Sequence, residues 1–210
     1  MKEGIDRTQR SGFDAGGERP DPLLFSSAFD DLGVDPSMLV TWAARAKAID
    51  ATGLLSSRGT ALLETLWSRD KYMGRLGVEA IARLEHFFDF AAVAAGRNII
   101  EQGEHGNFMI VLLSGNVAVD RRQPWGEQMR MAEARPGDIL GEMSLLDSGM
   151  RFAHCSTLNP CEIGVLDAEA LDGMMAGDPE LAASLIALLA RRLSLRLRIV
   201  GARVSDRQHP

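Results

Sequence analysis

The residues best suited to chemistry lie together around a short turn that follows an expected strand. Gly141 opens a single helical turn, and the backbone N–H groups of Met143 and Ser144 lie at its positive end, where an anion is favoured. Arg151 stands nine residues after Glu142, at the start of the next strand. A guanidinium that faces a helix N-terminus binds phosphate through charge-assisted hydrogen bonds, and a carboxylate accepts a hydrogen bond from a sugar hydroxyl. The pattern therefore predicts a site for one phosphate and one sugar.

This segment resembles the phosphate-binding cassette of the cyclic-nucleotide-binding domain family, which includes the bacterial catabolite activator protein and the regulatory subunits of cAMP-dependent protein kinase. The cassette pattern is Gly-Glu, any residue, Ala or Ser, and Leu, then five residues and Arg-x-Ala. The matching residues are Gly141, Glu142, Ser144, Leu145, Arg151 and Ala153. Upstream, the Gly103-Glu104 pair, the run 110–115 and Pro136-Gly137-Asp138 match landmarks of the family's barrel, so the resemblance spans about residues 86–205.

The resemblance implies a role for each residue of the cassette. Glu142 would bind the ribose 2′-hydroxyl and Arg151 the cyclic phosphate, while nearby backbone amides complete the phosphate site. The full expected ligand-binding set is Gly141, Glu142, Met143, Ser144, Arg151, Phe152, Ala153 and Arg196. Phe152 offers only its N–H where a threonine often accompanies guanine recognition in the family, which favours cAMP over cGMP.

Base recognition is expected to depart from the family pattern. Arg196 and Leu197 occupy the positions of a polar Thr-Ser pair that contacts adenine in the catabolite activator family. Stacking of the Arg196 guanidinium on the adenine ring is one way in which this chain would hold the base.

The elements that must position this site begin with helices. Residues 1–34 carry mostly Gly, Asp, Arg and Pro and are expected to form a disordered arm, apart from a short apolar cluster at 23–29 that has the means to dock. Residues 35–85 are expected to form a helical subdomain. Asp35-Pro36 should start its first helix, since Asp is a good N-cap and Pro suits the first helical position.

Residues 86–176 change to short apolar runs separated by turn signals, which is typical of a β-sandwich or barrel. We therefore expect an α+β fold: an eight-stranded antiparallel β-roll (a jelly-roll, or double-stranded β-helix) flanked by N-terminal helices and a long C-terminal helix. Within the roll, residues 152–158 and 161–166 are expected to form a hairpin around Asn159-Pro160. The last segment, 177–210, should be the long helix, with Asp178-Pro179 at its start.

The C-terminal helix carries two apolar stripes, of which one is enough to cover the barrel. The other is then free to act as a lid over a ligand or to pair with the same helix in a homodimer. The alternative is that both stripes are buried within one monomer. Because the sequence ends shortly after Val204, we expect no helix-turn-helix domain and no DNA partner.

Composition narrows the function further. The net charge of -6 argues against nucleic acid as a partner, and no apolar run is long enough to span a membrane. Together with only two cysteines and no signal-like start, this predicts a cytoplasmic protein. There is no phosphate-binding loop or nucleophile elbow, and His154 and Cys155 point to opposite faces of one strand. We therefore expect neither an enzyme nor a metal or other cofactor, and in particular not a metal-binding cupin.

These observations lead to one hypothesis with two alternatives. The chain is expected to be a cAMP sensor that signals to an unknown protein effector by repositioning its C-terminal helix. The first alternative is a structural or oligomerisation module on the same fold. The second is a sensor of cGMP or of a cyclic dinucleotide.

Overall fold

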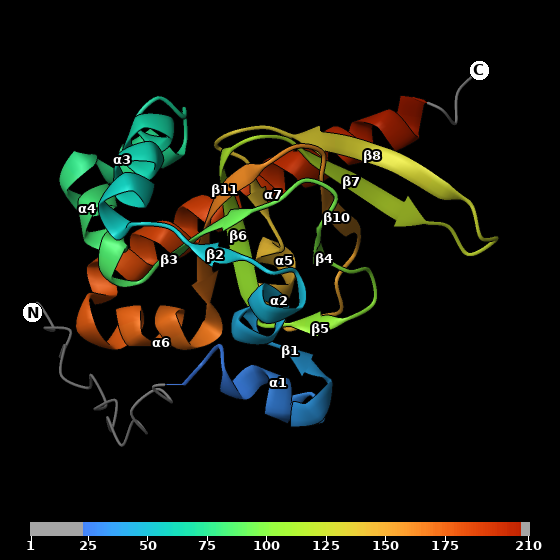
Figure 1. Cartoon of the computed structure of the whole chain (residues 1–210), viewed down its shortest axis with the longest axis horizontal. Coiled ribbons are helices and arrows are strands. Elements are labelled where there is room, and N and C mark those ends of the chain that lie inside the picture. The colour runs from blue at the N-terminus through green and yellow to red at the C-terminus, as the bar shows by residue number, and fades with distance from the viewer. Residues whose placement is uncertain (1–22, 207–210) are drawn as a thin grey trace, which may run out of the picture.

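The structure of the chain, a computed structural model, describes residues 23–206, with side chains described as far as residue 198. Two sheets form its centre, in the strand orders β4-β10-β7-β8 and β2-β3-β11-β6-β9 (Figure 1). The strands are β2 (Thr52–Gly53), β3 (Asp89–Val93), β4 (Asn98–Ile100), β6 (Phe108–Ser114), β7 (Val117–Arg122), β8 (Gln128–Ala134), β9 (Ile139–Leu140), β10 (His154–Thr157) and β11 (Cys161–Asp167). Their pairings are antiparallel, and the strands other than β2 form the predicted eight-stranded roll. The predicted α+β fold is therefore confirmed.

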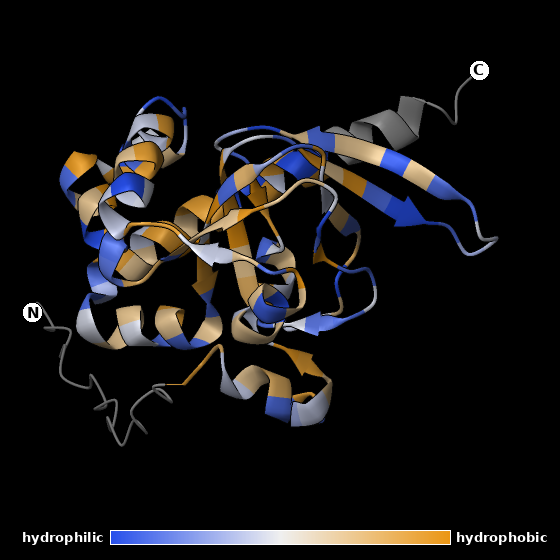
Figure 2. Ribbon diagram, in the orientation of Figure 1, coloured by the Kyte–Doolittle hydropathy of each residue, from blue (hydrophilic) through white to orange (hydrophobic). Residues whose placement is uncertain are grey.

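Strand β6 shows how one apolar run builds two cores. Successive side chains of a strand point to opposite faces of the sheet. Phe108 and Ile110 accordingly belong to the core inside the roll, whereas Met109 and Val111 belong to a second core between the sheet and the helices. All four are fully buried, which explains why this run is continuously apolar rather than alternating. Figure 2 shows the same contrast in colour, with an apolar β6 and a β7–β8 hairpin that becomes hydrophilic toward its tip.

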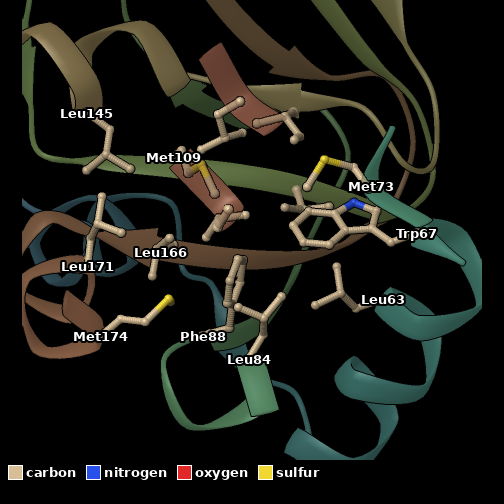
Figure 3. Close-up of a cluster of buried hydrophobic side chains, with 14 of the residues drawn as sticks. Leu63, Trp67, Met73, Leu84, Phe88, Met109, Leu145, Leu166, Leu171 and Met174 are labelled. Atoms are coloured by element: carbon tan, nitrogen blue, oxygen red, sulfur yellow. The ribbon is translucent and has the colours of Figure 1, made fainter. Parts of the chain in front are cut away.

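Helices cover the outer face of the second sheet. They are α3 (Ser56–Trp67), α4 (Val78–Arg83), α6 (Ala168–Gly177) and α7 (Pro179–Asp206). The 3-10 turn η2 (Met73–Leu76) lies between α3 and α4, and the 3-10 turn η3 (Leu84–His86) lies between α4 and β3. Figure 3 shows that side chains of these helices surround Met109 and Leu166 of the sheet, with Trp67 of α3 on one side of the cluster and Leu171 of α6 on the other. As predicted, Asp178 caps α7: its carboxylate accepts a hydrogen bond of 3.2 Å from the backbone N–H of Leu181. Among the described residues, no helix has both the length and the apolar character needed to cross a membrane.

The first predicted helix differs from expectation. Asp35 caps only a 3-10 turn, η1 (Pro36–Met38), and the chain is then extended as β1 (Leu39–Val40). This strand pairs in parallel with β5 (His105–Gly106), which takes up the backbone groups that a continuous helix would have used. The α-helix α2 (Trp42–Ala48) begins afterwards, where the Thr41 hydroxyl accepts a hydrogen bond from Ala44 N–H. The pairing with β5 is a long-range contact that helical spacing does not reveal.

The predicted arm 1–34 is also corrected in part. Residues 1–22 lie outside the described residues, but the remainder is ordered and contains α1 (Ser27–Asp31), with Phe29 fully buried. Its anchor is Asp172 of α6, a buried carboxylate that accepts hydrogen bonds of 2.9 Å from Phe25 N–H and Ser26 N–H and one of 2.7 Å from the Ser26 hydroxyl. The partner is more than a hundred residues away, so the local composition does not indicate it.

The expected hairpin around Asn159-Pro160 is wrong. Strand β10 pairs with β4 and β7 in one sheet, whereas β11 pairs with β3 and β6 in the other. The Asn-Pro connection therefore crosses between the sheets instead of folding β11 back onto β10. Turn residues mark a change of direction, but they do not determine whether the next strand returns to the same sheet.

Candidate functional site

The cassette connects strand β9 of one sheet to strand β10 of the other through a short helix that begins after a glycine. Helix α5 (Glu142–Asp147) follows β9 directly, and its N-cap is Gly141 with a left-handed φ of 78° and no side-chain cap. The first N–H groups of an α-helix have no partner within the helix. A Cβ on Gly141 would overlap the Arg151 guanidinium and lie 3.0 Å from Ile100. Glycine therefore permits both the backbone turn and the approach of the arginine.

Arg151 is a buried cation held by neutral groups. Its side chain donates hydrogen bonds of 2.7 Å to the Gly141 carbonyl and 2.5 Å to the Phe108 carbonyl, and its guanidinium lies 4.6 Å from the centroid of the Phe108 ring. The residue is only 3% exposed, and its Nε has no hydrogen-bond partner among the described residues. Within that part of the chain, no carboxylate lies within ion-pair distance of it. Burial lowers the pKa of Arg151 to about 10, so it remains charged at neutral pH.

Glu142 is the buried acid of the same site. It is 5% exposed, and its Oε1 accepts a hydrogen bond of 2.6 Å from Arg196 of α7. Burial raises the pKa of Glu142 above its ordinary value, while the charge of Arg196 lowers it again. The C-terminal helix thus makes a direct ionic contact with the carboxylate that the sequence assigned to a ribose hydroxyl.

A cavity of about 130 Å³ joins these groups. Its wall contains every residue of the expected ligand-binding set, namely Gly141, Glu142, Met143, Ser144, Arg151, Phe152, Ala153 and Arg196. The sequence did not single out the remaining lining residues, Ile100, Val119, Ile139, Leu140 and Cys155. Ile100, Val119 and Cys155 are inward-facing strand positions, and only alternation along β4, β7 and β10 would have indicated them. Ile139 and Leu140 form β9, which directly precedes the cassette.

Apolar side chains surround the mouth of this cavity. Met143 is 47% exposed and Phe152 is 51% exposed. The guanidinium carbon of Arg121, on β7, lies 3.7 Å from the centroid of the Phe152 ring, a cation–π contact that the sequence did not suggest. Arg121 therefore fixes an aromatic ring beside the charged groups of the cassette.

The turn that carries β5 supports Arg151 from behind. The backbone of Arg151 pairs with this turn: Gly103 N–H donates to its carbonyl at 2.9 Å, and its own N–H donates to the Glu104 carbonyl at 2.8 Å. A Cβ on Gly106 would lie 2.7 Å from the Arg151 Nε, so that glycine allows the side chain to pass. Gly103 and Glu104, noted in the sequence as barrel landmarks, thus belong to the support of the cassette.

Other parts of the chain offer less. Two other hollows, of about 590 Å³ beside Arg83 and Glu180 and of about 500 Å³ beside Asp120 and His154, have no buried arginine or lysine among their lining residues. The His154 ring lies 3.0 Å from the Asn98 amide oxygen. In the region that the structure describes, no group of three or more His, Cys, Asp or Glu side chains is arranged to hold a metal ion.

Comparison with known proteins places this geometry in a family. Residues 91–178 match the sequence profile described as "Cyclic nucleotide-binding domain". The CRP-like cAMP-activated global transcriptional regulator of Mycobacterium tuberculosis is 30% identical over 130 residues, which cover 59% of this chain and 58% of that protein. The cyclic AMP receptor protein of Thermus thermophilus is 35% identical over 107 residues, covering 51% of this chain and 50% of that protein. The chain therefore spans only about half the length of these curated relatives.

A solved structure agrees on the fold. A cyclic nucleotide-binding domain from Methylobacillus flagellatus superposes with a TM-score of 0.68, covering 75% of this chain and 89% of that chain at 24% identity. The profile match begins in β3 and ends just after α6, so it contains the roll and the whole cassette. Residues 91–178 of this chain therefore match the cyclic nucleotide-binding domain family in sequence, and the matching segment contains the whole cassette.

Proposed function

We propose that this chain binds cAMP in the cassette cavity and regulates a partner protein in response, without catalysing a reaction. The observation that carries the proposal is Arg151, a buried cation whose only described acceptors are two backbone carbonyls. A buried charge is costly unless it is paired. A ligand with a single negative charge, such as a cyclic phosphate, supplies the missing partner. It would lie between the guanidinium and the N–H groups of Met143 and Ser144 at the start of α5.

The sugar position follows from Glu142. Its carboxylate is buried beside the same cavity and accepts hydrogen bonds, which suits the ribose 2′-hydroxyl of a cyclic nucleotide. Two relatives carry cAMP in their names, and Phe152 offers only a backbone N–H at the position that follows the arginine. Both points favour adenine over guanine as the base.

Helix α7 supplies the response. The cavity of about 130 Å³ is small beside the roughly 300–1,000 Å³ of ordinary ligand pockets. Arg196, half-exposed on α7, forms one wall of it and is bonded to Glu142. Entry of a nucleotide therefore requires α7 to shift, and the ribose competes with Arg196 for the carboxylate. A ligand changes a conformational equilibrium only by binding its states unequally, and this competition provides that inequality.

Calorimetric titration of the purified chain with cAMP, cGMP and cyclic di-GMP tests the proposal. We expect cAMP to bind most tightly of the three. Tighter binding of cGMP or of the dinucleotide would assign the site to that ligand instead. If none of them binds, the chain is a structural module on the same fold and the proposal is wrong.

A further inference from the structure

A second arginine lies behind the cassette, on an element that the binding site does not include. Arg45 of α2 is 8% exposed and forms a short ion pair with Glu104 and a longer one of 3.3 Å with Glu101. Glu104 also accepts a hydrogen bond of 3.1 Å from Glu101 N–H. Among the described residues, the Nε of Arg45 has no hydrogen-bond partner, so the guanidinium makes its polar contacts with these two carboxylates through its two terminal nitrogens.

Glu104 is at the same time a near neighbour of Arg151. The two residues are joined through their backbones, and the Arg151 side chain passes directly over Gly106 of the same turn. Of the charged groups around Arg151, Glu104 does most to raise the pKa of that guanidinium against the effect of burial. The Glu104 side chain is 12% exposed, so water screens it little. Glu104 is thus the carboxylate best placed to neutralise Arg151, but Arg45 holds it.

We propose that Arg45 is a positioning residue for phosphate binding: by pairing with Glu104, it keeps that carboxylate from acting as the counter-charge of Arg151. The proposal rests on the function assigned above to Arg151. Without Arg45, the Glu104 carboxylate lies in a nearly buried position beside Arg151, which has no ion-pair partner among the described residues. An anionic ligand then competes with a carboxylate of the protein itself.

The fold explains how a residue from the N-terminal helix reaches this position. Strand β1 pairs in parallel with β5, which places the start of α2 against the turn that carries Glu104. Trp42, the first residue of α2, packs edge-on against the Phe108 ring at 5.7 Å between centroids, and Arg151 lies over that same ring. Helix α2 and the phosphate-binding arginine therefore share one packed layer.

The test compares cAMP binding to the wild-type chain, Arg45→Met, Arg45→Lys and the double variant Arg45→Met/Glu104→Gln by calorimetry. An opposite charge at close range changes ionic equilibria by about tenfold or more, so Arg45→Met should weaken cAMP binding by at least that factor. Arg45→Lys keeps the charge and should lie nearer to the wild type. The double variant removes the competing carboxylate and should recover most of the lost affinity.

The recovery separates an electrostatic role from a structural one. If Arg45 only supported the fold, the double variant would bind as weakly as Arg45→Met or more weakly, and that result overturns the proposal. Equal affinity of Arg45→Met and the wild type overturns it as well. If Arg45→Met does not fold, as judged by circular dichroism, the double variant still decides, because replacing both members of a buried pair is often tolerated. A wild-type chain that binds no cyclic nucleotide would instead refute the function on which this inference rests.

Discussion

The ion pair between Arg196 and Glu142 leads to a prediction whose size follows from burial. Arg196→Met keeps much of the apolar stem but removes the charge that faces the carboxylate. The Glu142 side chain is 6% exposed, whereas that of Arg196 is 47% exposed. Breaking a fully buried ion pair strongly destabilises a protein, whereas breaking a surface pair costs little. Because only one partner is buried here, we expect Arg196→Met to lower the free energy of unfolding by about 1–2 kcal/mol at neutral pH.

The size of this loss should depend on pH. Burial raises the pKa of Glu142, and Arg196 counteracts the rise. A carboxyl with a raised pKa in the folded state contributes stability that is fully present below its unfolded pKa and is lost as the pH rises through the folded pKa. Without Arg196 the folded pKa of Glu142 rises further, so more stability is lost between acidic and neutral pH. The cost of Arg196→Met is therefore smallest in acid, where Glu142 is protonated in both states.

Urea unfolding, followed by the fluorescence of the buried Trp42 and Trp67, measures this cost at both ends of that pH range. Arg198→Met, an exposed position on the same helix, is the matched control and should change stability by less than about 0.5 kcal/mol. A cost of Arg196→Met that is the same in acid and at neutral pH would refute the reasoning. It would mean that Arg196 stabilises the chain by packing and not by its charge.

Three further predictions concern the cassette. Glu142→Gln should weaken cAMP binding by about 1 kcal/mol or more but leave a 2′-deoxy analogue almost unaffected, and equal calorimetric losses for both ligands would exclude a ribose contact. Gly141→Ala should abolish binding and cost more stability than Gly77→Ala, because both glycines have positive φ but only Gly141 lies against Arg151; equal urea midpoints would contradict this. Addition of cAMP should slow amide hydrogen exchange in residues 141–153 by direct contact and in residues 193–198 because α7 moves against the filled cavity. Slower exchange in 141–153 alone would mean that α7 takes no part in the response to the ligand.

The cassette could be predicted from the sequence because its parts are local. Gly141, Glu142 and Arg151 lie within eleven positions on one turn and the adjoining chain, so their spacing alone brings them to one cavity. Arg196 was the one distant member, and the resemblance to a known family pointed to it. Short apolar runs between turn signals likewise predicted the roll, and apolar residues at helical spacing predicted the long helix α7, since both patterns reflect burial along a single element.

What could not be predicted depends on contacts between distant segments. The parallel pairing of β1 with β5 interrupted the first helix and brought Arg45 to Glu104. A carboxylate on α6, Asp172, anchors the apolar cluster 23–29, for which the sequence indicated an ability to dock but no partner. In each case the local sequence is compatible with the result, but the partner that decides it lies far away along the chain.

The most direct test of the account is the affinity of cAMP for Arg151→Met, measured by calorimetry beside the wild type. The account predicts tight, saturable binding to the wild-type chain and a loss of about 1.5–3 kcal/mol, roughly ten- to a hundredfold or more, in the variant, because a charge-assisted contact to the phosphate is removed. Arg97→Met, which breaks an exposed pair with Asp50 on the surface, is the control and should bind as the wild type does. If Arg151→Met binds cAMP as tightly as the wild type, the phosphate does not lie at Arg151 and the account is wrong.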